Sequence, residues 1–260
     1  MSRKSRLDYA FAVGRIKALE KSLIPYKLFL EALEAINLEE SLKIIYEAGL
    51  WPEEIIKAKK PKDIDRLCSQ EREKIDRLMA ELVERESLTF YLAQRELRNL
   101  LSSAISTGYS FFIDYARLCL DLANIKNFLR FKYRGNSFEI LTEHLYPGGF
   151  IEVRLFKESY EQSWADLYPL LMKTDYGHLW ERSLLALEEK NTFVVMEREC
   201  ENILIRFWRR AKEITFGPEP VLAYAMARQR EIDLLRLVII GRMLQLPSDL
   251  IKERMSETYV

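Results

Sequence analysis

The chain has 260 residues, of which 48% are hydrophobic and 31% are charged, and its 40 basic residues balance 40 acidic ones. Nine glycines and eight prolines leave little room for the frequent turns of an all-β fold. The zero formal net charge also lacks the basic excess that a nucleic-acid-binding domain usually shows. We therefore expect an all-α protein of amphipathic helices, with no nucleic-acid partner.

No transmembrane segment is expected. The longest charge-free stretch, residues 99–113, contains several hydroxyl side chains. It is also shorter than the ~20 apolar residues that a span needs. Cys68, Cys119 and Cys200 lie far apart and form no Cys-x-x-Cys pair. This spacing favours free thiols in a reducing cytoplasm over a disulfide framework.

The first hundred residues predict several helices punctuated by proline and glycine. The first three expected helices cover residues 5–23, 26–36 and about 37–49, and Trp51-Pro52 then turns the chain into 53–58. The first of them has an apolar face that consists of Leu7, Phe11, Gly14 and Ala18. Residues 63–101 fit one long charged helix or a broken pair. A coiled coil stays open as an alternative there, although the heptad is not sustained.

Beyond residue 110 the helix signals become stronger. A helix over 111–134 carries a regular apolar stripe and ends at Gly135-Asn136, where glycine and asparagine favour termination. A short helix over 138–145 precedes the turn at Pro147–Gly149. Several short helices are expected within 151–199, and a longer one over 197–216.

The stretch from Gly217 to Val260 is the most informative. Glycine can close one helix and proline can begin the next, which predicts a helix from Pro220 to about Leu246. Its apolar residues form two stripes with three-and-four spacing. We therefore expect an internal helix that packs against neighbours on two sides, followed by a short terminal helix from Ser248.

The helices over 111–134 and 220–246 are similar to each other at an offset of about 110 residues. Their apolar stripes align, and an acidic and two basic residues recur in register with the stripe. These are Asp121, Lys126 and Lys132 in the first helix, and Glu231, Arg236 and Arg242 in the second. Such repetition predicts quasi-symmetric units that pack together.

An ordered set of motifs near the C-terminal end carries a family resemblance. The motifs are Gly217–Tyr224, Glu231–Arg236, Ile240–Arg242, Leu246-Pro247 and Tyr259-Val260. Together they resemble the signature of the C-type subunit of archaeal and bacterial V-type (A-type) ATPases, a relative of the d-type subunit of the eukaryotic vacuolar ATPase. The segments 121–130 and 9–17 are also similar to the Asn-Ile-Lys element and the opening helix of that family.

Two departures from the family pattern stand out. Leu234 occupies a position where the family often has asparagine. The chain is also shorter than the members that we would expect, so one helical unit is expected to be trimmed, most plainly between residues 50 and 110.

The resemblance implies a single all-helical domain, a funnel-like assembly of about three units at approximately 1–100, 101–155 and 156–260. It implies a non-catalytic rotor subunit of the central stalk that links the axle subunits, of D and F type, to the membrane proteolipid ring. Torque for ion transport would pass through it. Its location would be cytoplasmic and peripheral, at the inner face of the membrane. The sequence distinguishes neither synthesis from hydrolysis of ATP nor protons from sodium ions.

Charged residues on the two repeated helices are the candidates for contacts with partners. They are Asp121, Lys126, Lys132, Arg228, Glu231, Arg236 and Arg242. The structural alternative for each is an ion pair along a helix edge, worth only a few tenths of a kcal/mol when exposed.

No catalytic, cofactor or metal site is expected. His144 and His178 belong to no nucleophile or metal motif. Neither a Gly-x-x-x-x-Gly-Lys loop nor a Gly-x-Gly-x-x-Gly loop is present to hold phosphate. The competing hypothesis is a free-standing helical-repeat adaptor or scaffold that binds peptides, because helical packing alone would fit it equally well.

Overall fold

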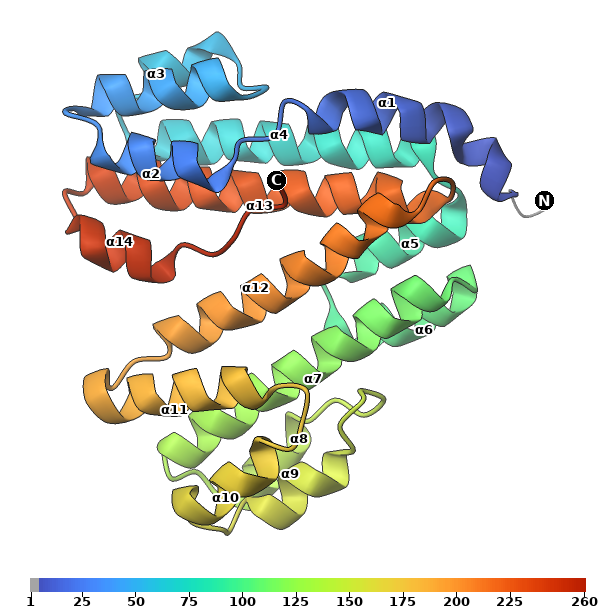
Figure 1. Ribbon diagram of the computed structural model, residues 1–260, viewed down its shortest axis with the longest axis vertical. Coiled ribbons are helices and arrows are strands. Elements are labelled where there is room, and N and C mark those ends of the chain that lie inside the picture. Colours follow the sequence, from blue (N-terminus) through green and yellow to red (C-terminus); the bar gives the residue numbers. More distant parts are fainter. Residues whose placement is uncertain (1–4) are drawn as a thin grey trace. The chain divides into compact units, whose positions relative to one another are not determined.

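The computed structural model describes residues 5–260, and every regular element in that range is a helix (Figure 1). The protein is therefore all-α, as predicted. Its described part divides into two compact units. Unit 1 contains the residues up to Leu88 together with Ile205–Val260, and unit 2 contains Thr89–Leu204. This division follows compactness, whereas the three repeat units expected from the sequence stay a prediction.

Unit 1 combines helices from both ends of the chain. Its N-terminal part contains η1 (Arg6–Tyr9), α1 (Ala10–Glu20), α2 (Tyr26–Glu34), α3 (Leu38–Ala48), η2 (Glu53–Lys57), α4 (Pro61–Leu82) and the start of α5 (Arg85–Ala93). Its C-terminal part contains the end of α12 (Val194–Arg209), η3 (Arg210–Glu213), α13 (Pro218–Met243) and α14 (Ser248–Arg254).

Unit 2 is formed by the middle of the chain. After the end of α5 come α6 (Leu97–Thr107), α7 (Ser110–Tyr133), α8 (Phe138–Glu143), α9 (Val153–Ser159), α10 (Trp164–Leu171), α11 (Gly177–Lys190) and the start of α12. Both α5 and α12 continue as helices through the boundary between the units.

The central helix of unit 1 is α13, which packs against α4, α1, α2, α3 and α14 (Figure 1). Gly217 precedes it with a φ of 133°, a conformation that glycine adopts without strain, and Pro218 supplies its first residue. Side chains of both predicted stripes, such as Leu234 and Leu235, are fully buried. The two-sided packing predicted for this helix is confirmed, but the helix ends at Met243 rather than near Leu246, and Leu244 and Leu246 of the predicted stripes are exposed.

Unit 2 is organised around α7, whose side chains form an aromatic and aliphatic core. Phe128 is fully buried, and its ring contacts those of Phe156, Tyr160 and Trp180 with centroids 5.7–5.9 Å apart. Large aromatic side chains of this kind contribute most of the apolar area that a small core buries. The helix predicted over 111–134 is confirmed, with bounds one residue earlier at each end.

The structure differs from two details of the sequence-based prediction. Residues 63–101 form parts of three helices rather than one or two, because α4 ends at Leu82 in extended backbone at Val83 and α5 ends at Ala93. The apolar face expected on the first helix is its exposed face, with Leu7 and Phe11 68% and 78% exposed. The buried face of α1 instead consists of Ala12, Val13 and Ile16.

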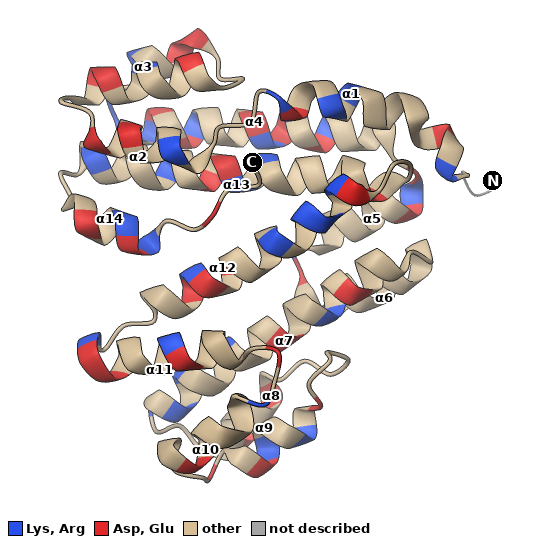
Figure 2. Cartoon of the chain, in the orientation of Figure 1, with Lys and Arg blue, Asp and Glu red and all other residues tan. Residues whose placement is uncertain are grey.

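Among the described residues, no helix has both the length and the apolar character needed to cross a membrane. Charged residues of both signs are distributed along the helices of each unit (Figure 2).

Candidate partner interface

The seven charged candidates lie on the central helices of the two units. Asp121, Lys126 and Lys132 belong to α7 in unit 2. The other four, Arg228, Glu231, Arg236 and Arg242, belong to α13 in unit 1. Their surroundings divide them into two groups. Some are buried and contact other segments of their own unit, and the others lie near the surface.

Arg228 and Glu231 form a buried ionic network in unit 1, and both are at most 3% exposed. The Arg228 guanidinium pairs with Glu231 one helical turn away and with Glu71 of α4 at 3.1 Å, and it donates to the Leu50 carbonyl at 2.9 Å. It also lies over the Trp51 ring, 4.9 Å from the centroid. Buried charges are tolerated when they are paired and hydrogen-bonded in this way. The network joins α13 to α4 and to the segment between α3 and η2.

Glu231 also fixes the loop between α1 and α2. Its carboxylate accepts hydrogen bonds from the backbone N–H of Ile24 at 2.9 Å and from the Trp51 indole at 3.3 Å. Ile24 lies two residues before the start of α2. The carboxylate therefore anchors the chain just before that short helix.

Asp121 has the same role in unit 2, where it is fully buried. Its carboxylate accepts from the backbone N–H groups of Phe150 and Ile151 at 3.0 and 3.1 Å, and from the Tyr176 hydroxyl at 2.7 Å. Burial raises the pKa of Asp121, and these three hydrogen bonds offset only part of that increase. Gly149 is required beside it, because a Cβ there would lie 2.0 Å from a carboxylate oxygen.

Lys132 and Arg242 bind the chain at the C-terminal ends of the two short helices, α9 and α2 respectively. Lys132 donates to the carbonyls of Tyr160 and Gln162, just beyond the end of α9. Arg242 donates to the carbonyls of Leu33 and Ala35, at the end of α2. A cation beside the carbonyls that end a helix satisfies groups that have no partner within the helix.

Each unit therefore contains one copy of the same arrangement, which we call a clamp. A buried carboxylate on the long helix holds the N–H two residues before a short helix. A base about three turns further along, on the same face, holds the carbonyls at its far end. The clamp residues are Asp121 and Lys132 around α9, and Glu231 and Arg242 around α2.

Lys126 and Arg236 lie at helix edges. Lys126 is 3.5 Å from Glu197 of α12, with its side chain 30% exposed. Arg236 is 2.7 Å from Asp65 of α4, and its side chain is 54% exposed. A second pair, Arg72 with Asp233, joins α4 and α13 at 2.6 Å. The exposed pairs of Arg236 and Arg72 contribute little stability, so Arg236 is available for other contacts, whereas the Lys126–Glu197 pair is partly buried.

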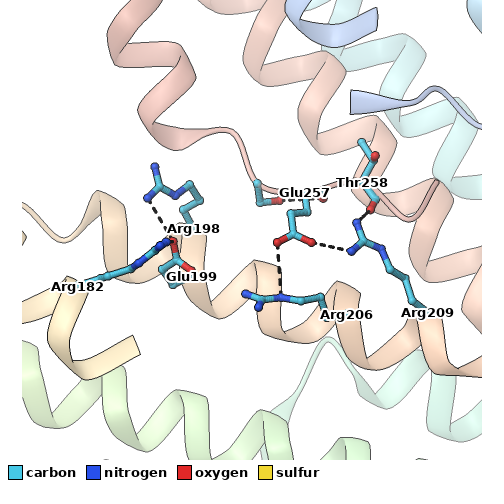
Figure 3. Close-up of polar contacts among 8 residues, drawn as sticks. Arg182, Arg198, Glu199, Arg206, Arg209, Glu257 and Thr258 are labelled. Carbon is cyan, nitrogen blue, oxygen red and sulfur yellow. Dashed lines mark hydrogen bonds and ion pairs between the residues drawn. The ribbon is translucent and has the colours of Figure 1, made fainter. Parts of the chain in front are cut away.

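The C-terminal segment is a feature that the helix patterns did not predict. Thr258 and Tyr259 are buried, although they follow the last helix in an extended segment. Figure 3 shows Glu257 between Arg206 and Arg209 of α12, with Thr258 against Arg209. Thr258 also accepts from the Tyr26 N–H at 3.1 Å. The segment thus joins α12 to the start of α2, and only the Tyr259-Val260 motif pointed to it.

A second cluster of charges in Figure 3 lies within unit 2. Glu199 of α12 accepts from Arg182 at 2.8 Å and from Arg198 at 3.2 Å. Burial raises the pKa of Glu199, but the hydrogen bonds and charges of the two arginines outweigh it and lower the pKa overall. The cluster fixes α11 on α12.

The described residues contain no group of three or more histidine, cysteine, aspartate or glutamate side chains placed to hold a metal ion. His144 and His178 are exposed. Cys68 and Cys200 are buried and Cys119 is half-buried, and all three are free thiols.

Comparison with known proteins gives a consistent result. A family model described as ATP synthase (C/AC39) subunit matches residues 91–254. The C-type subunit of the V-type sodium ATPase of Enterococcus hirae is 28% identical over 152 residues, which cover 58% of this chain and 46% of that protein. The C-type subunit of the A-type ATP synthase of Archaeoglobus fulgidus is 28% identical over 145 residues, 55% of this chain and 41% of that protein. The matched part thus spans less than half the length of these relatives.

Proposed function

The chain belongs to the ATP synthase (C/AC39) subunit family, and we propose that it is a non-catalytic subunit of the central stalk of a V/A-type rotary ATPase. In this role it links the axle subunits, of D and F type, to the membrane proteolipid ring. Torque passes between axle and ring through its helices and drives, or is driven by, ion transport.

The family match carries this proposal, because it covers both central helices, α7 and α13, together with nearly all of unit 2. The two clamps support a mechanical role. Each fixes both ends of a short helix to a long one through charged hydrogen bonds, which are stronger than neutral ones. Close-packed helices held in this way transmit strain within a unit. The recurrence of the clamp also supports construction from repeated units.

We assign the partner contacts to the candidates near the surface, above all Arg236 and Lys126. Asp121, Arg228 and Glu231 are buried and already hydrogen-bonded within their units. They act on partners indirectly, by holding the helices that carry the exposed residues. Lys132 and Arg242 close the clamps in the same way.

The protein is proposed to work in the cytoplasm, peripheral at the inner face of the membrane as part of the ATPase complex. The test is purification of the chain from its own cells through an affinity tag at an exposed position. Co-purification with axle subunits and a proteolipid ring is the expected result. Recovery with peptides or scaffold partners, and without any ATPase subunit, would overturn the proposal in favour of a helical adaptor.

A further inference from the structure

A small pocket in unit 2 has no role in the function proposed above. Its volume is about 220 Å³. Its lining residues are Tyr133, Trp164, Leu184, Leu187, Glu188 and Asn191. Typical pockets for whole small-molecule ligands measure about 300–1,000 Å³, so this one is the size for a single long side chain.

The walls of the pocket are aromatic and aliphatic. Leu184 and Leu187 are buried and form the aliphatic part. Trp164 is half-buried, and Tyr133 is 46% exposed at the rim. The Tyr133 hydroxyl donates to the Asn191 side chain at 3.0 Å, which fixes the ring at the rim. An apolar stem several carbon atoms long would be well accommodated between these walls.

The electrostatics of the pocket favour a positive charge. Glu188 is its only charged lining residue, and it is exposed with no ion-pair partner in the described part of the chain. The pocket also lies where two helices end, because Tyr133 is the last residue of α7 and Asn191 follows the last residue of α11 (Figure 1). Helix C-termini carry partial negative charge and attract cations.

The aromatic ring of Trp164 already receives a cation from this chain. The Lys132 ammonium lies 5.3 Å from its centroid while donating to two backbone carbonyls. The positive charge of Lys132 disfavours the binding of a second cation nearby, and so do the charges of Arg134 and Lys190 at the two helix ends. None of these three cations lines the pocket, however, and the one charged group that does is a carboxylate.

We infer that this pocket receives a lysine or arginine side chain presented by a partner protein. The apolar stem lies against Leu184, Leu187 and Trp164, and the cationic end meets Glu188 and the face of Tyr133 or Trp164. Aromatic rings combined with a carboxylate are a recurring way of binding such groups. This inference is independent of the rotary role, since it concerns one pocket of unit 2 in whatever complex the chain joins.

The experiment titrates the full chain with two matched probes, and ligand-observed NMR measures their binding. Nα-acetyl-lysine methylamide carries the stem and the ammonium, and Nα-acetyl-norleucine methylamide carries nearly the same stem without the charge. We expect saturable binding of the lysine probe that weakens with added salt, and weaker binding of the norleucine probe. Equal binding of both probes, or no saturable binding of the lysine probe, would overturn the inference.

Variants then localise the binding. Glu188→Gln should weaken the lysine probe about two- to five-fold, the range expected for an exposed charge contact. Trp164→Leu should weaken it about two- to thirty-fold, through loss of the cation–π contact. The matched control is Glu189→Gln, an exposed neighbour that does not line the pocket. Equal weakening by Glu188→Gln and Glu189→Gln would indicate general charge attraction and contradict the proposed site. Circular dichroism and thermal unfolding verify that each variant is folded.

Discussion

Asp121 and Glu231 occupy equivalent places on the two central helices. Each is a buried carboxylate that accepts a hydrogen bond from the N–H two residues before a short helix, Ile151 before α9 and Ile24 before α2. In unit 2 the short helix follows the long one in the chain, whereas in unit 1 it precedes it by most of the sequence. The same contact is therefore made by segments with opposite order in the chain.

The pKa of Asp121 gives a pH-dependence that can be measured. Because burial raises this pKa above its ordinary value of 3.8, the folded state holds the proton more tightly than the unfolded chain does. The contribution of Asp121 to stability is therefore present at low pH and is lost as the pH rises through the raised pKa. Asp121→Asn does not titrate, so its stability relative to wild type should increase as the pH rises above 3.8.

Urea unfolding of both proteins over a pH series measures this difference. Glu189→Gln, which removes an exposed carboxylate from the same unit, is the control and should follow wild type across the series. A constant difference between Asp121→Asn and wild type at every pH would contradict the assignment.

The buried network around Arg228 predicts that substitution of this arginine strongly lowers the stability of the protein. Further substitutions of its acidic partners should restore part of that stability. Arg228→Met leaves the buried carboxylate of Glu231 without its cation and leaves that of Glu71 paired only with the exposed Lys74. Removal of one partner from a buried ion pair costs about 3–5 kcal/mol in the free energy of unfolding. The triple variant Arg228→Met, Glu71→Gln, Glu231→Gln removes both buried carboxylate charges and should recover part of that loss.

Chemical denaturation of the full chain measures both effects, with Arg72→Met as the control. Arg72 pairs with Asp233 on the same two helices, but both side chains are substantially exposed. Its loss should cost no more than about 1 kcal/mol. Similar losses for the two single variants would show that burial of the Arg228 network does not govern its energy.

The thiols are expected to be unreactive in the folded protein. Burial raises the pKa of Cys68 to about 11 and that of Cys200 to about 12. Since the thiolate is the reacting form, a raised pKa and lack of access both slow the reaction. Ellman's reagent at mildly alkaline pH should label none of the three cysteines until denaturant is added. Rapid labelling of Cys200→Ser, in which Cys68 and Cys119 remain, would place a reactive thiol at one of those two positions.

The sequence predicted the long helices well because their signals are local. Apolar stripes and the breakers Gly135 and Gly217 lie within the segments themselves. The sequence allowed for one break within 63–101 but located neither the break after Leu82 nor the one after Ala93, since no glycine or proline marks them and packing determines where those helices end. The exposed face of α1 was equally ambiguous, because both faces of that helix are apolar.

The residues of the two clamps were predictable from the sequence, but their contacts were not, and the partner interface itself stays a prediction. The recurring acid and base identified Asp121, Lys132, Glu231 and Arg242, which form the clamps. Their partners are backbone N–H and carbonyl groups from distant segments, and such groups leave no mark in the sequence. The contacts of Thr258 were missed for the same reason.

Removal of the C-terminal segment should have two separate effects. It should lower the stability of the protein, and it should uncouple ATP hydrolysis from ion transport. Deletion of the last four residues removes the buried Thr258 and Tyr259 with their bonds to Tyr26 and α12. Loss of one large buried side chain should lower the stability of unit 1 by about 2–3 kcal/mol. In the complex, ATP hydrolysis by the catalytic head should continue while ion transport falls, since the segment fixes α12 to α2 within the proposed rotor.

Transport and ATPase assays on membranes that contain the variant complex measure the two activities together. Deletion of Val260 alone is the control, because that residue is exposed and its loss removes the acceptor of the Thr258 hydroxyl but keeps the contacts of the segment with Tyr26 and α12. Normal ion transport by the four-residue deletion would refute a coupling role for this segment.

Arg236 offers the sharpest test of a partner contact, because its pairing within the chain can be removed and restored. Arg236→Glu breaks the exposed pair with Asp65, which should cost less than about 1 kcal/mol of stability. The reversed pair, Arg236→Glu with Asp65→Arg, restores the ion pair between α13 and α4 in the opposite direction. If Arg236 binds another component of the complex, both variants should weaken assembly with the axle subunits and ring, measured by co-purification from cells. If its role is only to join α13 to α4, the reversed pair should assemble as wild type does, and the assignment of Arg236 to the interface would be wrong.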